Sequence, residues 1–219
     1  MRKRNIYCTL DTETVGGVCG DNLIYHIGGL IHDRQGNVIA GFNYIIAENY
    51  EMFDNAFYAK RNMARYDEMV RTGMATMIPT EEMALAMVDN LCNYYGVDYM
   101  MAYNTNYDFT RTNAKMLIEN RQFIDIYLMA SETLGQRKKY ADFCRKNDFR
   151  TGSNNAKMSA EVVYAYLTGN PDFEEEHTAL EDAKIEVEIF KACINAHQRF
   201  TKNCHQQDDP NKWNLYVKL

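Results

Sequence analysis

One stretch near the N-terminus decides the fold: Ile6-Tyr7-Cys8-Thr9-Leu10-Asp11-Thr12-Glu13. Its first five residues are alternating strand formers, so they predict a β-strand that ends at Asp11. Residues two apart in an extended segment project to the same side, so Asp11 and Glu13 can face one metal ion. The pattern D-x-E is frequent by chance, however, and a solvated strand end explains this pair better when it is taken alone.

Further strands and helices follow this first strand. Residues 23–31 and 38–46 are predicted strands, and the turn chemistry from Asp33 to Asn37 predicts that they pair as an antiparallel hairpin. Shorter strands are predicted at 99–103 and 123–127. Helices are predicted from Pro79, after Asp108, from Ser159 to Leu167, and from Thr178 to about Arg199. This order predicts an α/β fold with a mixed sheet covered by helices on both faces.

The length suits one domain. The 219 residues are 46% hydrophobic and 25% charged, which is ordinary for a globular protein whose core needs no disulfide or structural metal. We expect a single domain over residues 1–200, with a helical insertion near 51–78. A polar C-terminal tail then occupies residues 201–219.

The cysteines and the N-terminus predict a cytoplasmic protein. The six cysteines are scattered and form no C-x-x-C pair, which is typical of small buried thiols in a reducing compartment. The N-terminus lacks a long apolar signal core. No apolar run approaches the ~18 residues of a membrane span, so no membrane partner is expected.

The charge is unevenly distributed along the chain. A formal net charge of −6 argues against a protein that coats long nucleic acid by charge alone. Between Leu134 and Lys157, seven basic residues nevertheless stand against two acidic ones. The basic residues are Arg137, Lys138, Lys139, Arg145, Lys146, Arg150 and Lys157. Composition alone favours a solvated helix face for this stretch.

Two more acidic motifs stand where predicted helices begin. Asp108 closes the polar turn Asn104-Thr105-Asn106-Tyr107-Asp108, where helix capping explains it as well as metal binding does. His177 and Asp182 frame the start of the last helix, although a surface histidine and acids that complement the helix dipole would look the same. The ordered set is more specific than its parts. Phosphodiester cleavage by two divalent ions needs carboxylates that converge from distant positions.

In this order the motifs resemble those of the DEDDh exonucleases, the family that includes the proofreading subunit of bacterial replicative DNA polymerase. The matching segments are Leu10 to Thr14, Ala102 to Asn104 with Asp108, and His177 to Ala183, and Phe123 to Ile126 resembles the strand after the second motif. A closer likeness is to stand-alone exonucleases of phages and prophages. It depends on Phe57 to Lys60, on Tyr140 to Cys144, and on Ser159 to Glu161 leading to Glu176 to Thr178. A phage-encoded protein would act in the host cytoplasm.

The resemblance implies a ribonuclease-H-like mixed sheet of five strands and two bound ions, Mg²⁺ or Mn²⁺. Asp11 would bridge both ions, with Glu13 and Asp182 on the ion at the nucleophile side. Asp108 would hold the second ion, largely through water. His177 would be the general base, a role that suits an imidazole with a pKa near 6.5.

The resemblance also implies substrate contacts at Thr12, Thr14, Val15 and Asn104. The backbone amide of Thr14 would face the terminal 3′ hydroxyl. The sequence departs from the family after Thr14, where Val15-Gly16-Gly17-Val18 leaves open which apolar residue wedges the last base. With this resemblance, the basic stretch becomes a candidate surface for tracking a single strand.

Three functions compete at this point. The first is hydrolysis of nucleotides from the 3′ end of single-stranded or frayed DNA. The second uses the same site to trim RNA or short oligoribonucleotides, and the choice depends on contacts to the 2′ hydroxyl. The third is a binding module for a nucleic acid or a polymerase, but such a module is expected to lose one or more of the five site residues, and all are present. No polymerase domain is attached, so proofreading would need a polymerase in trans.

Overall fold

The computed structural model describes residues 5–15, 23–50 and 59–196. Three predicted features lie outside these ranges: the residues after Val15, the first part of the 51–78 insertion, and the 201–219 tail. The division into one domain and a tail therefore stays a prediction.

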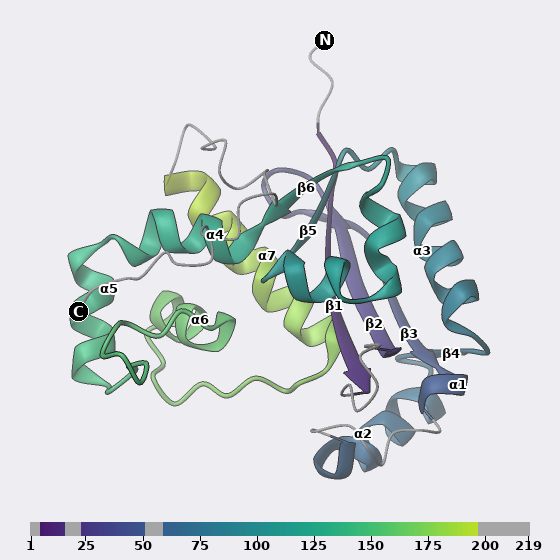
Figure 1. Cartoon of the computed structure of the whole chain (residues 1–219), viewed down its shortest axis with the longest axis horizontal. Helices are drawn as coiled ribbons and strands as arrows, with labels where there is room; N and C mark the ends of the chain where they lie inside the picture. The colour runs from purple at the N-terminus through teal and green to yellow at the C-terminus, as the bar shows by residue number, and fades with distance from the viewer. Residues whose placement is uncertain (1–4, 16–22, 51–58, 197–219) are drawn as a thin grey trace.

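A mixed six-stranded sheet forms the centre of the described chain, in the order β4-β3-β2-β1-β5-β6 (Figure 1). The strands are β1 (Tyr7–Val15), β2 (Leu23–His32), β3 (Val38–Ile46), β4 (Thr76–Ile78), β5 (Tyr99–Ala102) and β6 (Gln122–Asp125). Strands β1, β2 and β3 pair antiparallel, while β5 joins β1, β6 joins β5 and β4 joins β3 in parallel. The predicted mixed sheet is confirmed, but it has six strands instead of five. Strand β4 is only three residues long and depends on pairing with β3, so no local pattern marks it.

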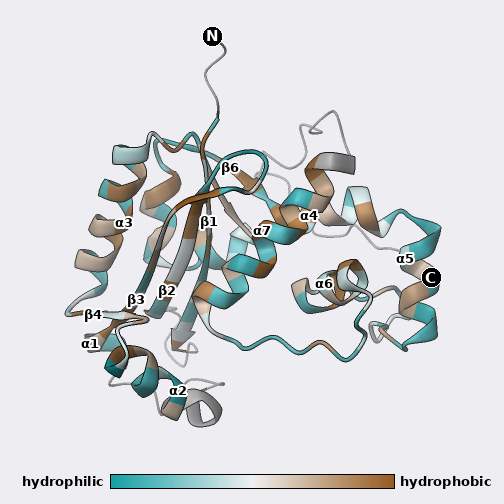
Figure 2. Cartoon of the chain, turned by 180° about the vertical axis from the view of Figure 1, so that it is seen from behind, coloured by the Kyte–Doolittle hydropathy of each residue, from teal (hydrophilic) through white to brown (hydrophobic). Residues whose placement is uncertain are grey.

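Helices cover both faces of this sheet, as predicted. They are α1 (Ala47–Tyr50), α2 (Ala59–Arg71), α3 (Glu81–Tyr95), α4 (Ile126–Ala130), α5 (Lys138–Lys146), α6 (Ala160–Thr168) and α7 (Ala179–Ala196). Helix α3 lies on one face and α7 on the other, and α5 and α6 lie beyond the β6 side of the sheet (Figure 1). Hydrophobic and hydrophilic segments alternate along α7, as expected of a helix with one buried side (Figure 2). In the described ranges, no helix is long and apolar enough to cross a membrane.

Side-chain alternation along β1 sorts its residues between two cores. Tyr7 packs in the cluster that contains residues of α7, whereas Cys8 and Leu10 pack in the cluster that contains residues of α3. Because alternate residues share a face, Asp11 and Glu13 belong to the α7 side of β1. This register places both acids toward the start of the last helix.

Two predicted elements differ from the structure after the strands β5 and β6. The helix expected after Asp108 is a π-helical turn, η2 (Asn106–Thr110), followed by a 3₁₀ helix, η3 (Asn113–Ile118). The hydroxyl of Thr112 donates to the carbonyl oxygen of Asp108 and accepts the N–H of Ala114, so it ends one turn and caps the next. The strand expected to reach Tyr127 ends at Asp125, because that side chain caps helix α4 through the N–H of Leu128.

Candidate active site

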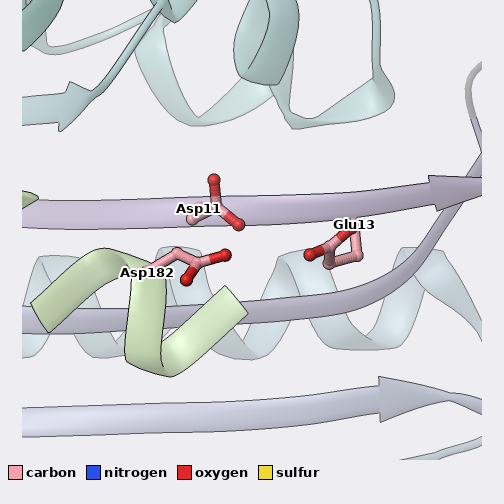
Figure 3. Close-up of side chains that lie close together, drawn as sticks. All are labelled: Asp11, Glu13 and Asp182. Atoms are coloured by element: carbon pink, nitrogen blue, oxygen red, sulfur yellow. The ribbon is translucent and has the colours of Figure 1, made fainter. Parts of the chain in front are cut away.

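Three carboxylates meet between β1 and the first turns of α7. One oxygen from each of Asp11, Glu13 and Asp182 lies within 4.8 Å of the others, as a shared metal ion would require. Figure 3 shows Asp11 and Glu13 projecting from β1 toward Asp182 on α7. The structure thus brings together three of the five residues that the sequence singles out as catalytic.

A glycine in β2 allows this convergence. Gly28 pairs with Asp11 across the β1–β2 ladder. A Cβ atom at position 28 would lie 2.2 Å from the backbone nitrogen of Leu180. The first turn of α7 therefore rests directly on the backbone of β2, and this close approach sets Asp182 beside Asp11.

The electrostatics of the three-acid group favour a bound cation. Burial, followed by repulsion from Asp182, raises the pKa of Glu13 to about 8. Burial, followed by repulsion from Glu175, likewise raises the pKa of Asp182 to about 8, and Oδ1 of Asp182 is buried with no hydrogen-bond partner. The pKa of Asp11 is also well above its usual range, mainly through burial. Hard oxygen ligands that repel one another in this way fit a divalent cation.

Asp108 lies next to this group but is held by a different set of contacts. Its Oδ1 accepts the backbone N–H of Thr12 at 3.1 Å and the hydroxyl of Thr12 at 2.8 Å. Burial raises the pKa of Asp108 to about 7, although the two bonds from Thr12 oppose that shift. The turn before it is fixed by Asp125, whose Oδ2 accepts both the N–H and the hydroxyl of Thr105. Thr12, predicted as a substrate contact, is buried and holds Asp108 in place.

His177 lies two residues before α7 in a backbone conformation that is uncommon for residues other than glycine, with φ of 51°. Helix α2 contacts the same loop at two points. The hydroxyl of Tyr66 donates to the carbonyl oxygen of His177, and Arg65 forms an ion pair with Glu176. The described part of the predicted insertion is therefore packed against the loop that carries the predicted general base.

Buried polar contacts from β2 brace the start of α7. Nδ1 of His26 accepts the N–H of Ala179 at 3.2 Å, and Nε2 lies 2.6 Å from Oδ1 of Asn43, so the ring proton belongs on Nε2. Burial lowers the pKa of His26 to about 4, which keeps the ring neutral. The neighbouring Tyr25 donates its hydroxyl to Oε2 of Glu13 at 3.5 Å. No local sequence signal marks these two residues as part of a site.

The other predicted substrate contacts occupy three different environments. The hydroxyl of Thr14 lies 2.8 Å from the hydroxyl of Tyr107. Val15 is buried in the cluster that also contains Tyr25. Asn104 has a φ of 81° and lines a cavity beside Asp11.

This cavity has a volume of about 570 Å³ and opens beside the acids. Its walls come from β1, from the turn after β5, from the 151–160 segment and from α7. Its lining residues are Asp11, Tyr103, Asn104, Tyr127, Thr151, Asn155, Ala156, Met158, Ser159, Ala160, Glu175, Asp182 and Glu186. Two acids in this lining, Glu175 and Glu186, are absent from the sequence-based prediction. The only available signal for Glu186 was its spacing of four residues from Asp182, which also fits an ordinary solvated helix face.

Sequence comparison finds no protein-family model and no curated protein that matches this chain. Structure comparison finds several nucleases. A 3′-exonuclease that recognises the histone mRNA stem-loop at its 3′ end is similar, with a TM-score of 0.56 and 10% identity, over 89% of this chain and 84% of that one. Cell-death related nuclease 4 is similar with a TM-score of 0.53 and 12% identity, over 96% and 74%.

E. coli Exonuclease I in complex with a dA16 oligonucleotide has a TM-score of 0.50 and 13% identity, over 89% of this chain. The present chain spans only 41% of that larger protein. At 10–13% identity these likenesses concern the fold. The family resemblance implied a ribonuclease-H-like architecture. The structure comparison confirms this fold, which the chain shares with known 3′-exonucleases.

Proposed function

We propose that this protein is a metal-dependent 3′-to-5′ exonuclease that removes nucleotides from single-stranded or frayed DNA ends. The observation that carries the proposal is the meeting of Asp11, Glu13 and Asp182 within 4.8 Å, in the fold of 3′-exonucleases. Asp182 lies 169 residues after Glu13 in the sequence, so the group depends on the fold. Without a cation their mutual repulsion would oppose folding, so a purely structural role is disfavoured.

The proposed roles divide the site between metal binding and proton transfer. Asp11, Glu13, Asp182 and Asp108 would hold two divalent ions, which supply a Lewis acid for the scissile phosphate and lower the pKa of the attacking water. His177 would accept the proton from that water. The αL conformation of His177 and the contact from Tyr66 support this role, because they fix the loop that carries the imidazole.

The nucleic acid strand would approach over the 151–160 segment. This segment forms one wall of the cavity, and Arg150 directly before it and Lys157 within it are exposed. Lys138, Lys139 and Lys146 on α5 are exposed as well. A basic surface that continues from the wall of an acidic site can hold phosphates while the terminal bond is cleaved. Proofreading together with a polymerase would be a further use of the same activity.

The test is a single-stranded DNA labelled at its 5′ end, incubated with protein and Mn²⁺, with EDTA, and with Asp11→Ala. We expect a ladder that shortens from the 3′ end only with metal and wild-type protein. Absence of a ladder on both DNA and RNA, with intact binding to the strand, would instead identify a binding module.

RNA is the alternative substrate, and one structural neighbour is a 3′-exonuclease that recognises the 3′ end of an mRNA stem-loop. Matched DNA and RNA oligonucleotides of one sequence decide between them through the ratio of kcat/KM values. A 3′-phosphate version of each strand controls for direction, because a blocked 3′ end should slow removal of the first nucleotide.

A further inference from the structure

Glu186 is a buried acid that the proposed catalytic set does not use. It lies on α7 one turn after Asp182, so the two side chains project from the same side of the helix. Only 2% of Glu186 is exposed, and it lines the cavity together with Asp11 and Asp182. An acid so deeply buried needs a compensating partner or a neutral form.

The protein supplies only half of the contacts that this carboxylate needs. The backbone N–H of Tyr103 is hydrogen-bonded to it, but Oε2 has no hydrogen-bond partner. The lining of the cavity, drawn from the described residues, contains no lysine or arginine. Burial raises the pKa of Glu186 well above its usual range, and repulsion from Asp108 adds to the shift.

A second orphaned oxygen is close by on the same helix. Oδ1 of Asp182 is also buried with no partner, although Asp182 contributes to the three-acid group. Asp182 and Glu186 therefore each carry a buried carboxylate oxygen without a hydrogen-bond partner, and both residues line the cavity that Asp11 also lines. A divalent cation satisfies such oxygens, because Mg²⁺ and Mn²⁺ bind hard oxygen ligands from carboxylates and water.

We propose that Glu186 is an additional cation ligand, which binds a divalent metal ion on the cavity side of Asp11 together with Asp182. The proposal rests on the proposed function, since it extends the metal site of that function. The cavity would then bind a hydrated divalent cation together with the phosphate group that accompanies it.

A structural role makes a different prediction for Glu186. If this residue served only to accept the N–H of Tyr103, glutamine would serve equally well and would remove a costly buried acid. Glu186→Gln would then leave metal binding unchanged and raise the melting temperature of the metal-free protein. A cation ligand predicts weaker metal binding, because a neutral amide oxygen is a poorer ligand than a carboxylate.

The experiment is a calorimetric titration of the full chain with Mn²⁺, in the absence and presence of a nucleoside monophosphate. The same titration is made on Glu186→Gln and on Glu188→Gln. Glu188 is on the same helix, but it is exposed and pairs with Lys191 at the surface, so its variant removes an equal charge outside the cavity. We expect Glu186→Gln to weaken Mn²⁺ binding by about tenfold or more, as loss of a metal-site contact commonly does, and Glu188→Gln to match wild type.

The outcomes separate this proposal from the proposed function. Equal Mn²⁺ affinity for wild type and Glu186→Gln would overturn the role of Glu186, while metal-dependent cleavage by wild type would keep the exonuclease assignment. If wild-type protein bound no Mn²⁺ with or without the monophosphate, both proposals would fail. Equal weakening by both variants would show a general charge effect and would also overturn the assignment.

Discussion

The hydroxyl of Tyr66 donates to the carbonyl oxygen of His177 at 3.4 Å, which ties helix α2 to the loop before α7 across 111 residues of sequence. The same hydroxyl lies 3.2 Å from Nδ1 of His26, the atom that receives the N–H of Ala179. One phenol thus contacts both the predicted general base and the support of the helix that carries Asp182. We infer that α2 restrains the position of His177.

Tyr66→Phe should therefore slow catalysis without weakening metal binding. The ring would still fill its buried position, but a neutral hydrogen bond worth about 1 kcal/mol would be lost, which corresponds to about fivefold in kcat if it serves positioning. Tyr50→Phe is the matched control, since its ring contacts Tyr66 and its hydroxyl donates to Asp67 instead. The measurement is the rate constant of single-turnover cleavage with saturating metal. Equal rate constants for Tyr66→Phe and wild type would contradict the restraint.

His177→Asn separates the imidazole from its backbone conformation. Asparagine tolerates the αL region, so the loop should keep its shape while the proton acceptor is lost. We expect cleavage to fall by about 10²–10⁴-fold, the usual contribution of a general base, with little change in melting temperature. A variant that retains more than about a tenth of wild-type activity at neutral pH would assign the proton transfer to another group.

The elements nearest to strong local signals were predictable from the sequence. The hairpin of β2 and β3 matched within one residue, because alternating strand formers flank the turn from Asp33 to Asn37. Helix α3 begins at the predicted place, because the hydroxyl of Thr80 caps it by accepting the N–H of Met83. We could expect Asp11, Glu13 and Asp182 to meet because a metal site requires its carboxylates to converge. No pattern in the segment around Asp11 and Glu13, however, specifies that Asp182 is their partner.

The remaining features depend on contacts between distant segments. Glu186 looks like any solvated helix acid until the cavity is known, and Gly28 looks like a weak point in a strand until α7 is placed against it. Strand β4 and the irregular turns after Asp108 likewise depend on partners elsewhere in the chain. Local periodicity carries no information about such contacts, so sequence reasoning could not supply them.

Gly28→Ala should displace the first turn of α7. The added methyl group would overlap the backbone at Leu180, which cannot move as a flexible side chain can. We expect a loss of about 2 kcal/mol or more in the free energy of unfolding, together with weaker metal binding, because Asp182 moves with the helix. Gly152→Ala is the control, since nothing lies within 4 Å of a Cβ at that exposed position. Denaturant unfolding of both variants with and without Mn²⁺ makes the measurement, and unchanged stability of Gly28→Ala would contradict the close packing.

The stabilising effect of metal should grow as the pH rises from about 6.5 to 8.5. Folding raises the pKa of Glu13 and Asp182 to about 8, so the metal-free folded state binds more protons than the unfolded state over this range. Its stability must then fall as the pH rises, and a divalent cation that replaces those protons restores more stability at high pH than at low pH. Below this range His26 has the opposite effect, and stability rises with pH. Folding lowers the pKa of His26 to about 4, so the unfolded state takes up the proton first as the pH falls.

Melting curves at several pH values, with EDTA and with Mg²⁺, check the predicted growth of the metal effect with pH. Asp182→Asn should flatten it, and a metal effect that shrinks with rising pH in the wild type would show that these carboxylates are not the ligands.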